Sequence, residues 1–158
     1  MTLDDYPEHR PNVGVVLFNT EGWVWLGRRV HTPEPWNWQF PQGGVDRGED
    51  LHEAALRELD EETGVTSVSL LDRTDDWVVY DFPPEVLARG GRWKGQKQVW
   101  FAFRFEGEES EIKLDAHHQI EFDAWRWARL DETPGLIIPF KRSTHETVAA
   151  AFARFAGD

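Results

Sequence analysis

Three glutamates in one short segment are the residues best placed to do chemistry. Glu58, Glu61 and Glu62 follow one another at i, i+3 and i+4, so a helix would carry them on one face. Like charges crowded in this way repel each other, at a cost of a few tenths of a kcal/mol per pair on a helix. Most acidic runs on helices are simply solvated faces. A cluster kept at that cost is nevertheless a candidate seat for a hard divalent cation.

The segment that carries these glutamates is predicted to be helical. Leu51, Ala55 and Leu59 recur at i+4 spacing, which gives an apolar stripe for packing on a core. Gly64 follows the last periodic residue, where a glycine in the left-handed conformation would end the helix. The preceding PQGG and DRG sequences predict a glycine-rich turn. We therefore expect a loop, a helix and a second loop, with carboxylates on the face away from the core.

The acidic run also fits a longer pattern, which is Gly-x5-Glu-x7-Arg-Glu-apolar-x-Glu-Glu-x-Gly-apolar. All nine specified positions over 23 residues are matched, from Gly43 to Val65. This is the signature of the Nudix hydrolases, and the chain resembles that superfamily. The resemblance implies that Glu58, Glu61 and Glu62 bind metal, with the Gly43 carbonyl joining them. It also implies that Arg57 orients the carboxylate of Glu49 through a salt bridge.

Blocks outside the acidic run extend the resemblance over about residues 6 to 155. They are similar to the bacterial branch that hydrolyses RNA 5′ ends and dinucleoside polyphosphates; the blocks are RPNVG (10–14), WNWQFPQGG (36–44), GQKQVWF (95–101), EFDAWRW (121–127) and PFKR (139–142). By this resemblance Glu121 also reaches the metals. The residues expected to bind substrate are Arg10 and Arg29 at the 5′ phosphates or nucleotide, Gln96 and Lys97 at the polyphosphate, and Phe140 with Lys141 beside a base. Core packing is an equally good reading of Phe140.

Composition narrows the cofactors and partners. The 158 residues include no cysteine, which excludes disulfides and thiolate metal sites, so carboxylate oxygens favour Mg²⁺ or Mn²⁺, in more than one ion. A net charge of −12 argues against a protein that coats long duplex nucleic acid. It permits a phosphorylated substrate held through cations. With no long apolar run and a polar N-terminus, we expect a cytoplasmic protein without membrane contact.

The predicted elements describe one domain over residues 1–158. We expect strands at 12–19, 23–29, 66–71, 76–82, 97–106 and 124–130, and a C-terminal helix at 144–156 with Ser143 or Thr144 as its N-cap. This order predicts an α/β domain with a mixed central sheet, consistent with the α/β/α sandwich of the Nudix fold. His117 and His118 are expected at the surface. In loop 83–94, Arg92 and Lys94 could close over phosphates or stay solvated.

These observations lead to a ranked set of functions. The resemblance implies a metal-dependent pyrophosphohydrolase that converts a 5′-triphosphorylated RNA end to a monophosphate. The alternative is a hydrolase of dinucleoside polyphosphates such as diadenosine tetraphosphate, because both substrates join a nucleoside to a polyphosphate. A non-catalytic nucleotide-binding regulator is a third possibility. The intact set of mutually repelling glutamates speaks against it, since a silent domain would tolerate their loss.

Overall fold

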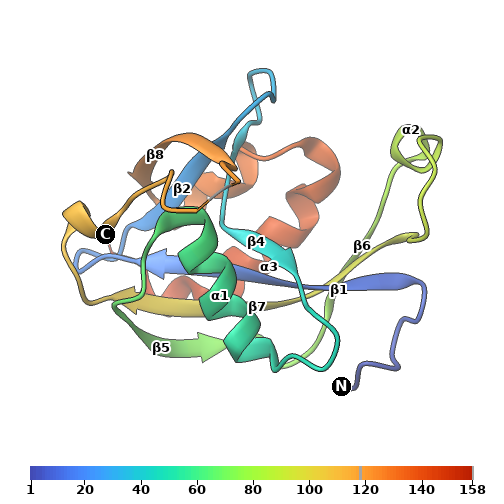
Figure 1. Ribbon diagram of the computed structural model, residues 1–158, viewed down its shortest axis with the longest axis horizontal. Coiled ribbons are helices and arrows are strands. Elements are labelled where there is room, and N and C mark those ends of the chain that lie inside the picture. The colour runs from blue at the N-terminus through green and yellow to red at the C-terminus, as the bar shows by residue number, and fades with distance from the viewer. Residues whose placement is uncertain (118, 158) are drawn as a thin grey trace.

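The computed structural model describes residues 1–117 and 119–157, with a mixed β-sheet between two longer helices (Figure 1). The strands are β1 (His9–Phe18), β2 (Val24–Arg29), β3 (Trp38–Gln39), β4 (Gln42–Gly44), β5 (Val68–Arg73), β6 (Val78–Asp81), β7 (Gly95–Phe105) and β8 (Phe122–Ala128). The helices are α1 (Leu51–Thr63), α2 (Pro84–Leu87) and α3 (Arg142–Phe152), with short 3-10 turns at Glu109–Glu111, Leu130–Gly135, Pro139–Lys141 and Ala153–Phe155. None of the described helices is long and apolar enough to cross a membrane.

The sheet combines parallel and antiparallel strands, as predicted. Its order is β3-β2-β1-β7-β5, with β4 paired to β1, β6 to β7 and β8 to β2. The two central strands, β1 and β7, run parallel from the His9–Gly95 pair to the Phe18–Arg104 pair. The other strand pairings within the described ranges are antiparallel. The long parallel pair forms the centre from which the remaining strands extend.

Two cores lie on opposite faces of this sheet, which confirms the predicted layered α/β architecture. On one face, Ala55 and Leu59 of α1 pack with Val13 and Val15 of β1. On the other face, Phe152 of α3 packs in the second core, which alternate residues of the central strands also enter. Successive side chains of a strand point to opposite faces, so β1 and β7 supply apolar residues to both cores.

Helix α1 is delimited by specific caps at both ends. The side chain of Asp50 accepts a hydrogen bond from the backbone N–H of Glu53 at 3.1 Å, as an N-cap residue does. At the other end Gly64 adopts φ = 78°, the left-handed conformation predicted for it, and its N–H donates to the carbonyl of Asp60. The caps fix the register of the helix, and with it the direction of its glutamates.

Two local predictions were wrong. The predicted glycine-rich turn is in part the strand β4, in which Gly43 pairs with Val13. This pairing is possible because β1 pairs with β2 only near Phe18, which leaves the start of β1 free to pair with β4. The C-terminal helix begins at Arg142, so Ser143 and Thr144 lie inside it and neither is the N-cap. A 3-10 turn at Pro139–Lys141 leads directly into this helix and replaces a side-chain cap.

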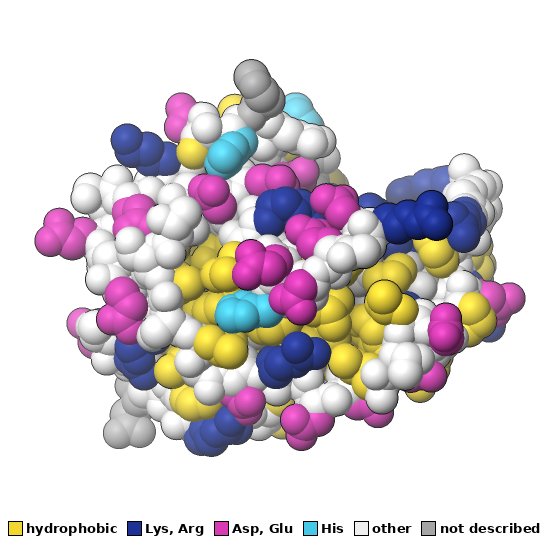
Figure 2. Space-filling view, turned by 60° about the horizontal axis from the view of Figure 1, so that its bottom comes forward, with side chains coloured by type: hydrophobic (Ala, Val, Ile, Leu, Met, Phe, Trp, Pro, Cys, Tyr) yellow, Lys and Arg dark blue, Asp and Glu magenta, His cyan; other side chains and the backbone are white. Residues whose placement is uncertain are grey.

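Residues 82–94, which we call the arm, project from the sheet between β6 and β7 and contain α2 (Figure 1). None of these residues is buried. Lys and Arg side chains gather on this projection, at the right of Figure 2, whereas acidic side chains are spread over much of the rest of that face. The arm is therefore a solvated extension of two sheet strands.

Candidate metal and phosphate site

Helix α1 directs its clustered glutamates into one cavity. Glu58 and Glu62 are buried, with relative exposures of 9% and 7%, whereas Glu61 is exposed. All three line the cavity, as their i, i+3 and i+4 spacing predicted. The backbone N–H of Gln42 in β4 donates to Oε2 of Glu62 at 3.1 Å, which ties the glutamate to the neighbouring strand.

Arg57 organises the carboxylates at the start of this site. Its Nε and Nη2 donate to the two carboxylate oxygens of Glu49 at 2.8 and 2.9 Å, so the predicted ion pair forms with bidentate geometry. Nη2 also donates to the carbonyl of Gly44 at 2.9 Å. Nη1 lies 2.8 Å from Oε1 of Glu58 and 3.3 Å from Oε2 of Glu61. One guanidinium therefore contacts the loop, the ion-pair partner and two of the clustered glutamates.

The carboxylates lie in an environment that disfavours their charge. Burial raises the pKa of Glu58, although the hydrogen bond from Arg57 opposes the rise. Burial raises the pKa of Glu62 well above its usual value of 4.5, and the charges of Glu58 and Glu121 raise it further. Glu121 thus acts on both buried glutamates, as expected of a carboxylate in the same site. A bound divalent cation would offset the energetic cost of burying these charges and of their mutual repulsion.

The donor set fits a hard divalent cation. The clustered glutamates offer carboxylate oxygens, and the chain contains no cysteine. Gly43 leaves the necessary space, because a Cβ there would lie 2.1–2.3 Å from the carboxylate of Glu58. Within residues 1–117 and 119–157, no three acidic or histidine side chains already converge on one coordination centre. Two of the carboxylates, those of Glu58 and Glu61, instead accept hydrogen bonds from Nη1 of Arg57.

A cavity of about 750 Å³ joins the acidic residues to cationic ones. Its carboxylates are Glu58, Glu61, Glu62 and Glu121, and its cations are Arg10, Arg29 and Lys141. The guanidinium of Arg10 lies against Gly44, where a Cβ would approach its Nη2 to 2.4 Å. The remaining lining residues are polar side chains and glycines; they are Asn12, Gln39, Gln42, Gly43, Gly44, Gln96, His117 and Gln119. Carboxylates and cationic side chains thus share one space.

The pairing of β2 with β8 explains how Glu121 reaches the cavity. Glu121 directly precedes β8, and its carbonyl accepts a hydrogen bond from the N–H of Val30 at 3.0 Å. Val30 follows Arg29, the last residue of β2. The same contact therefore brings one acidic and one cationic lining residue together, from segments about ninety residues apart in the sequence.

An aromatic cluster supports the cationic part of the cavity. The Nζ of Lys141 lies 5.8 Å from the ring centroid of Tyr80 and 5.9 Å from that of Phe140. The hydroxyl of Tyr80 donates to Oε1 of Gln96 at 2.6 Å. Burial, with a smaller effect of the charge on Arg29, lowers the pKa of Lys141 to about 8. Phe140 is half-buried against Tyr80, at 6.0 Å between centroids, so its ring is not enclosed in either core.

Lys97 does not belong to this cavity, which corrects our expectation. Its side chain is buried, and its Nζ donates to the carbonyls of Leu3, at 2.7 Å, and of Asp5. The ring of Trp77 lies 5.1 Å from the same nitrogen. Gln96 lines the cavity and Lys97 is its neighbour on β7, so the two side chains point to opposite faces of the sheet. Lys97 holds the N-terminal segment instead of a phosphate.

Several polar residues of the site were not predicted from the sequence. The amide Nε2 of Gln98 donates to Oδ1 of Asn12 at 2.7 Å and to Oε1 of Gln42 at 2.9 Å. This network joins β1, β4 and β7 beneath the cavity and continues through the backbone of Gln42 to Glu62. The available signal was the set of amide side chains in the QFPQGG and GQKQ sequences, which lie before the predicted helix and at the start of the strand predicted at 97–106, respectively.

One of the two adjacent histidines also lies at the cavity. We expected both at the surface. His117 is exposed but lines the cavity together with Gln119, and its Nε2 lies 3.3 Å from Oδ1 of Asp60 on α1. His118 lies outside the described residues.

Comparison with known proteins identifies the family to which this chain is similar. Residues 8–151 match the family model of the NUDIX domain. A protein of Caulobacter vibrioides named RNA pyrophosphohydrolase is 68% identical, over 99% of this chain and 92% of that protein. One of Rhizobium meliloti with the same name is 50% identical, over 97% of this chain and 98% of that protein.

Solved structures with low sequence identity share the fold. The dihydroneopterin triphosphate pyrophosphohydrolase of E. coli has a TM-score of 0.69 at 20% identity, over 90% of this chain and 98% of that one. A binary complex of the C. elegans Ap4A hydrolase has a TM-score of 0.65 at 19% identity, over 91% and 98%. With the family model covering residues 8–151 and the acidic helix in place, this chain belongs to the Nudix family.

Proposed function

We propose that this chain is a metal-dependent hydrolase that converts the 5′-triphosphate end of RNA to a monophosphate and releases pyrophosphate. The observation that carries the proposal is the cavity in which clustered carboxylates and cations lie side by side. Relatives that are 68% and 50% identical over nearly their whole length bear the name RNA pyrophosphohydrolase. A triphosphate held by cations and by carboxylate-bound metal ions fits both halves of this cavity.

We assign the metal site to residues from three segments. Carboxylates of Glu58, Glu61, Glu62 and Glu121, with the carbonyl of Gly43, would hold Mg²⁺ or Mn²⁺, in more than one ion. Nudix hydrolases generally use divalent metal ions. On binding, Nη1 of Arg57 would release Glu58 and Glu61, while its two hydrogen bonds to Glu49 keep the guanidinium in place. Arg57 and Glu49 are then positioning residues.

The reaction requires only water as nucleophile. A bound divalent ion lowers the pKa of a water molecule and stabilises charge on the phosphate oxygens. The water oxygen forms a new bond to phosphorus as an anhydride P–O bond breaks, and that bond's electron pair leaves with pyrophosphate. Glu121 is the carboxylate we assign to accept the proton of the water. Its partial exposure and its place beside Arg29 distinguish it from the more buried Glu62.

The substrate is held by the cationic part of the cavity. We assign Arg10, Gln96 and Lys141 to the polyphosphate and Arg29 to the phosphates or the first nucleotide. The Phe140 ring, half-buried against Tyr80, is placed to stack on a base, an interaction worth about 1–3 kcal/mol. Because a base that stacks on Phe140 cannot stay stacked in a duplex, the partner is RNA with a single-stranded 5′ end, met in the cytoplasm, and not a long duplex. We assign this activity to residues 1–158 as one domain.

The proposal is tested by following pyrophosphate release from a triphosphorylated RNA with and without Mg²⁺. Glu62→Gln should reduce turnover by at least about 100-fold, because a buried metal ligand loses its charge. Glu53→Gln, an exposed position on the same helix, is the matched control and should leave turnover unchanged. Near-normal activity of Glu62→Gln would sink the metal assignment. Absence of pyrophosphate release by the unmodified chain would sink the activity itself.

A further inference from the structure

The arm carries a concentration of unpaired positive charge on an acidic protein. Residues 82–94 include three cations and one acid, Glu85, whereas the whole chain has a net charge of −12. Arg89, Arg92 and Lys94 are all exposed. Within the described residues none of the three forms an ion pair. Cations that form no ion pair within the protein are available for an external anion.

The arm grows directly out of the substrate cavity. Its two limbs continue β6 and β7, which are paired at Tyr80 with Gln96 and at Asp81 with Gly95. Gln96 lines the cavity, and Phe82 donates its N–H to the carbonyl of Lys94 at 2.9 Å at the base of the arm. Arg92 is four residues from Gln96 and therefore lies at most about 14 Å from it along the chain. An RNA chain that leaves the cavity on this side would pass the arm within a few nucleotides of its 5′ end.

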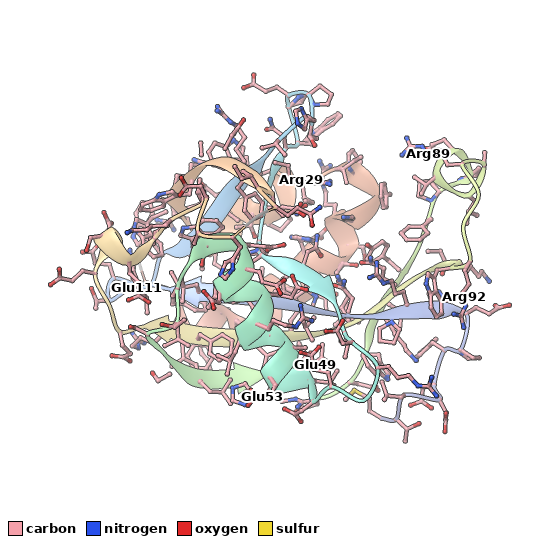
Figure 3. All side chains as sticks on the ribbon, in the orientation of Figure 1. Arg29, Glu49, Glu53, Arg89, Arg92 and Glu111 are labelled. Atoms are coloured by element: carbon pink, nitrogen blue, oxygen red, sulfur yellow. The ribbon has the colours of Figure 1, made fainter. Side chains whose placement is uncertain are left out.

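One cation of the arm is held in a defined position. The guanidinium of Arg92 lies 4.4 Å from the ring centroid of Trp93, a half-buried residue. Stacking of this kind restricts the arginine and leaves its N–H groups in the ring plane free to donate. Cations interleaved with aromatic rings are typical of surfaces that bind single-stranded nucleic acid. In Figure 3, Arg89 and Arg92 lie on the arm at the right, well separated from Glu49 and Glu53 near the start of α1.

These cations do not serve the triphosphate. None of Arg89, Arg92 and Lys94 lines the cavity, whose cations are Arg10, Arg29 and Lys141. We propose that the arm binds the phosphodiester backbone of RNA downstream of the 5′ end, through Arg89 and Arg92. The choice of RNA as the anion rests on the function proposed above. The arm would then make the protein sensitive to substrate length, whereas the cavity alone recognises the terminal nucleotides.

The first measurement is binding without chemistry. A labelled single-stranded RNA of about ten nucleotides with a 5′-monophosphate is titrated by fluorescence anisotropy in the absence of divalent ions. Arg89→Ala/Arg92→Ala should raise Kd about three- to tenfold. The slope of log Kd against log[salt] should become shallower by about 0.7 per lost phosphate contact. Because no residue of the arm is buried, the double variant should retain the Tm of the unmodified chain.

Two positive charges far from the arm provide a matched control. Arg104→Ala/Lys113→Ala removes the same charge; Arg104 lies at the end of β7 opposite Gly95, about 30 Å along the strand. In this control, the changes in Kd and in its salt dependence should be only a small fraction of those in Arg89→Ala/Arg92→Ala. Equal weakening by both double variants would reduce the arm effect to net charge and overturn the proposal.

The second measurement is substrate length. On a triphosphorylated dinucleotide the arm variant should keep the kcat/KM of the unmodified chain, and on the ten-nucleotide RNA it should fall about three- to tenfold. Unchanged binding and unchanged length dependence would overturn the proposal and leave the arm to another anionic partner. Arm-dependent RNA binding without any pyrophosphate release would instead uphold the arm and refute the proposed activity. The two failures are thus distinguishable.

Discussion

Arg57 donates two hydrogen bonds of nearly equal length to Glu49, from Nε to Oε2 at 2.8 Å and from Nη2 to Oε1 at 2.9 Å. Eight residues separate the pair in sequence, and the contact closes the loop before α1 onto the helix. The ion pair lowers the pKa of Glu49, chiefly through the hydrogen bonds from Arg57. The third nitrogen of the guanidinium reaches Glu58, so the position of a proposed metal ligand depends on this pair.

Replacing Arg57 by lysine should therefore damage the site while keeping its charge. An ammonium cannot reproduce the planar fork that contacts Glu49 and the Gly44 carbonyl together. We expect kcat/KM to fall about 10–100-fold, as for other groups that orient metal ligands. Steady-state kinetics at saturating Mg²⁺ provide the measurement, with Arg47→Lys, an exposed arginine of the same loop, as the control. Full activity in Arg57→Lys would show that charge alone suffices.

Gly43→Ala tests the space left for the metal ligands. A Cβ at this position would lie 2.1–2.3 Å from the carboxylate of Glu58, so the glutamate must move. We expect the Mg²⁺ concentration for half-maximal activity to rise about 10–100-fold. Gly135→Ala is the control, because a Cβ there has no neighbour within 4 Å. If the two variants have the same Mg²⁺ requirement, Gly43 is not part of the metal site.

Glu62→Gln should make the metal-free protein more stable. Burial raises the pKa of Glu62, so its charged form destabilises the folded state, and that cost grows as the pH rises from the unfolded to the folded pKa. We expect a gain on the order of 1 kcal/mol near pH 8, or about 2–4 °C in Tm, and a smaller gain near pH 5. Thermal melts in EDTA measure it. Adding Mg²⁺ should stabilise the unmodified chain more than the variant; a variant less stable without metal would contradict this reading.

The pH dependence of substrate capture should report Lys141. Burial lowers its pKa to about 8, so the ammonium that we assign to the polyphosphate loses its proton above that pH. We expect kcat/KM to decline above about pH 8, since this ratio follows the ionisation of the free enzyme. In Lys141→Arg the guanidinium stays protonated, and the decline should move to higher pH. A decline at the same pH in both proteins would assign it to another group.

Local signals in the sequence predicted the acidic helix well. The i, i+3, i+4 spacing of Glu58, Glu61 and Glu62 and the position of Gly64 depend only on neighbouring residues, and the structure has the helix and the left-handed glycine in place. The spacing did not say that Glu58 and Glu62 are buried and Glu61 is not. Burial depends on how α1 sits against β4, which is a tertiary contact.

Errors arose where distant segments decide the outcome. Adjacent positions on one strand face opposite ways, so Gln96 and Lys97 could not both line the cavity, and alternation alone would have excluded one of them. Choosing which one required knowing that the N-terminal segment covers the other face. The network of Gln98, Asn12 and Gln42 was beyond reach for the same reason, since it joins three strands far apart in sequence.

The proposed choice of substrate is tested most directly by comparing kcat/KM for a triphosphorylated RNA and for diadenosine tetraphosphate, under the same Mg²⁺ concentration and pH. Both substrates present a nucleoside joined to a polyphosphate to the cavity lined by Arg10, Arg29 and Lys141. We predict a clear preference for the RNA, with pyrophosphate as the released product. A strong preference for the dinucleotide would contradict it and make this chain a dinucleoside polyphosphate hydrolase.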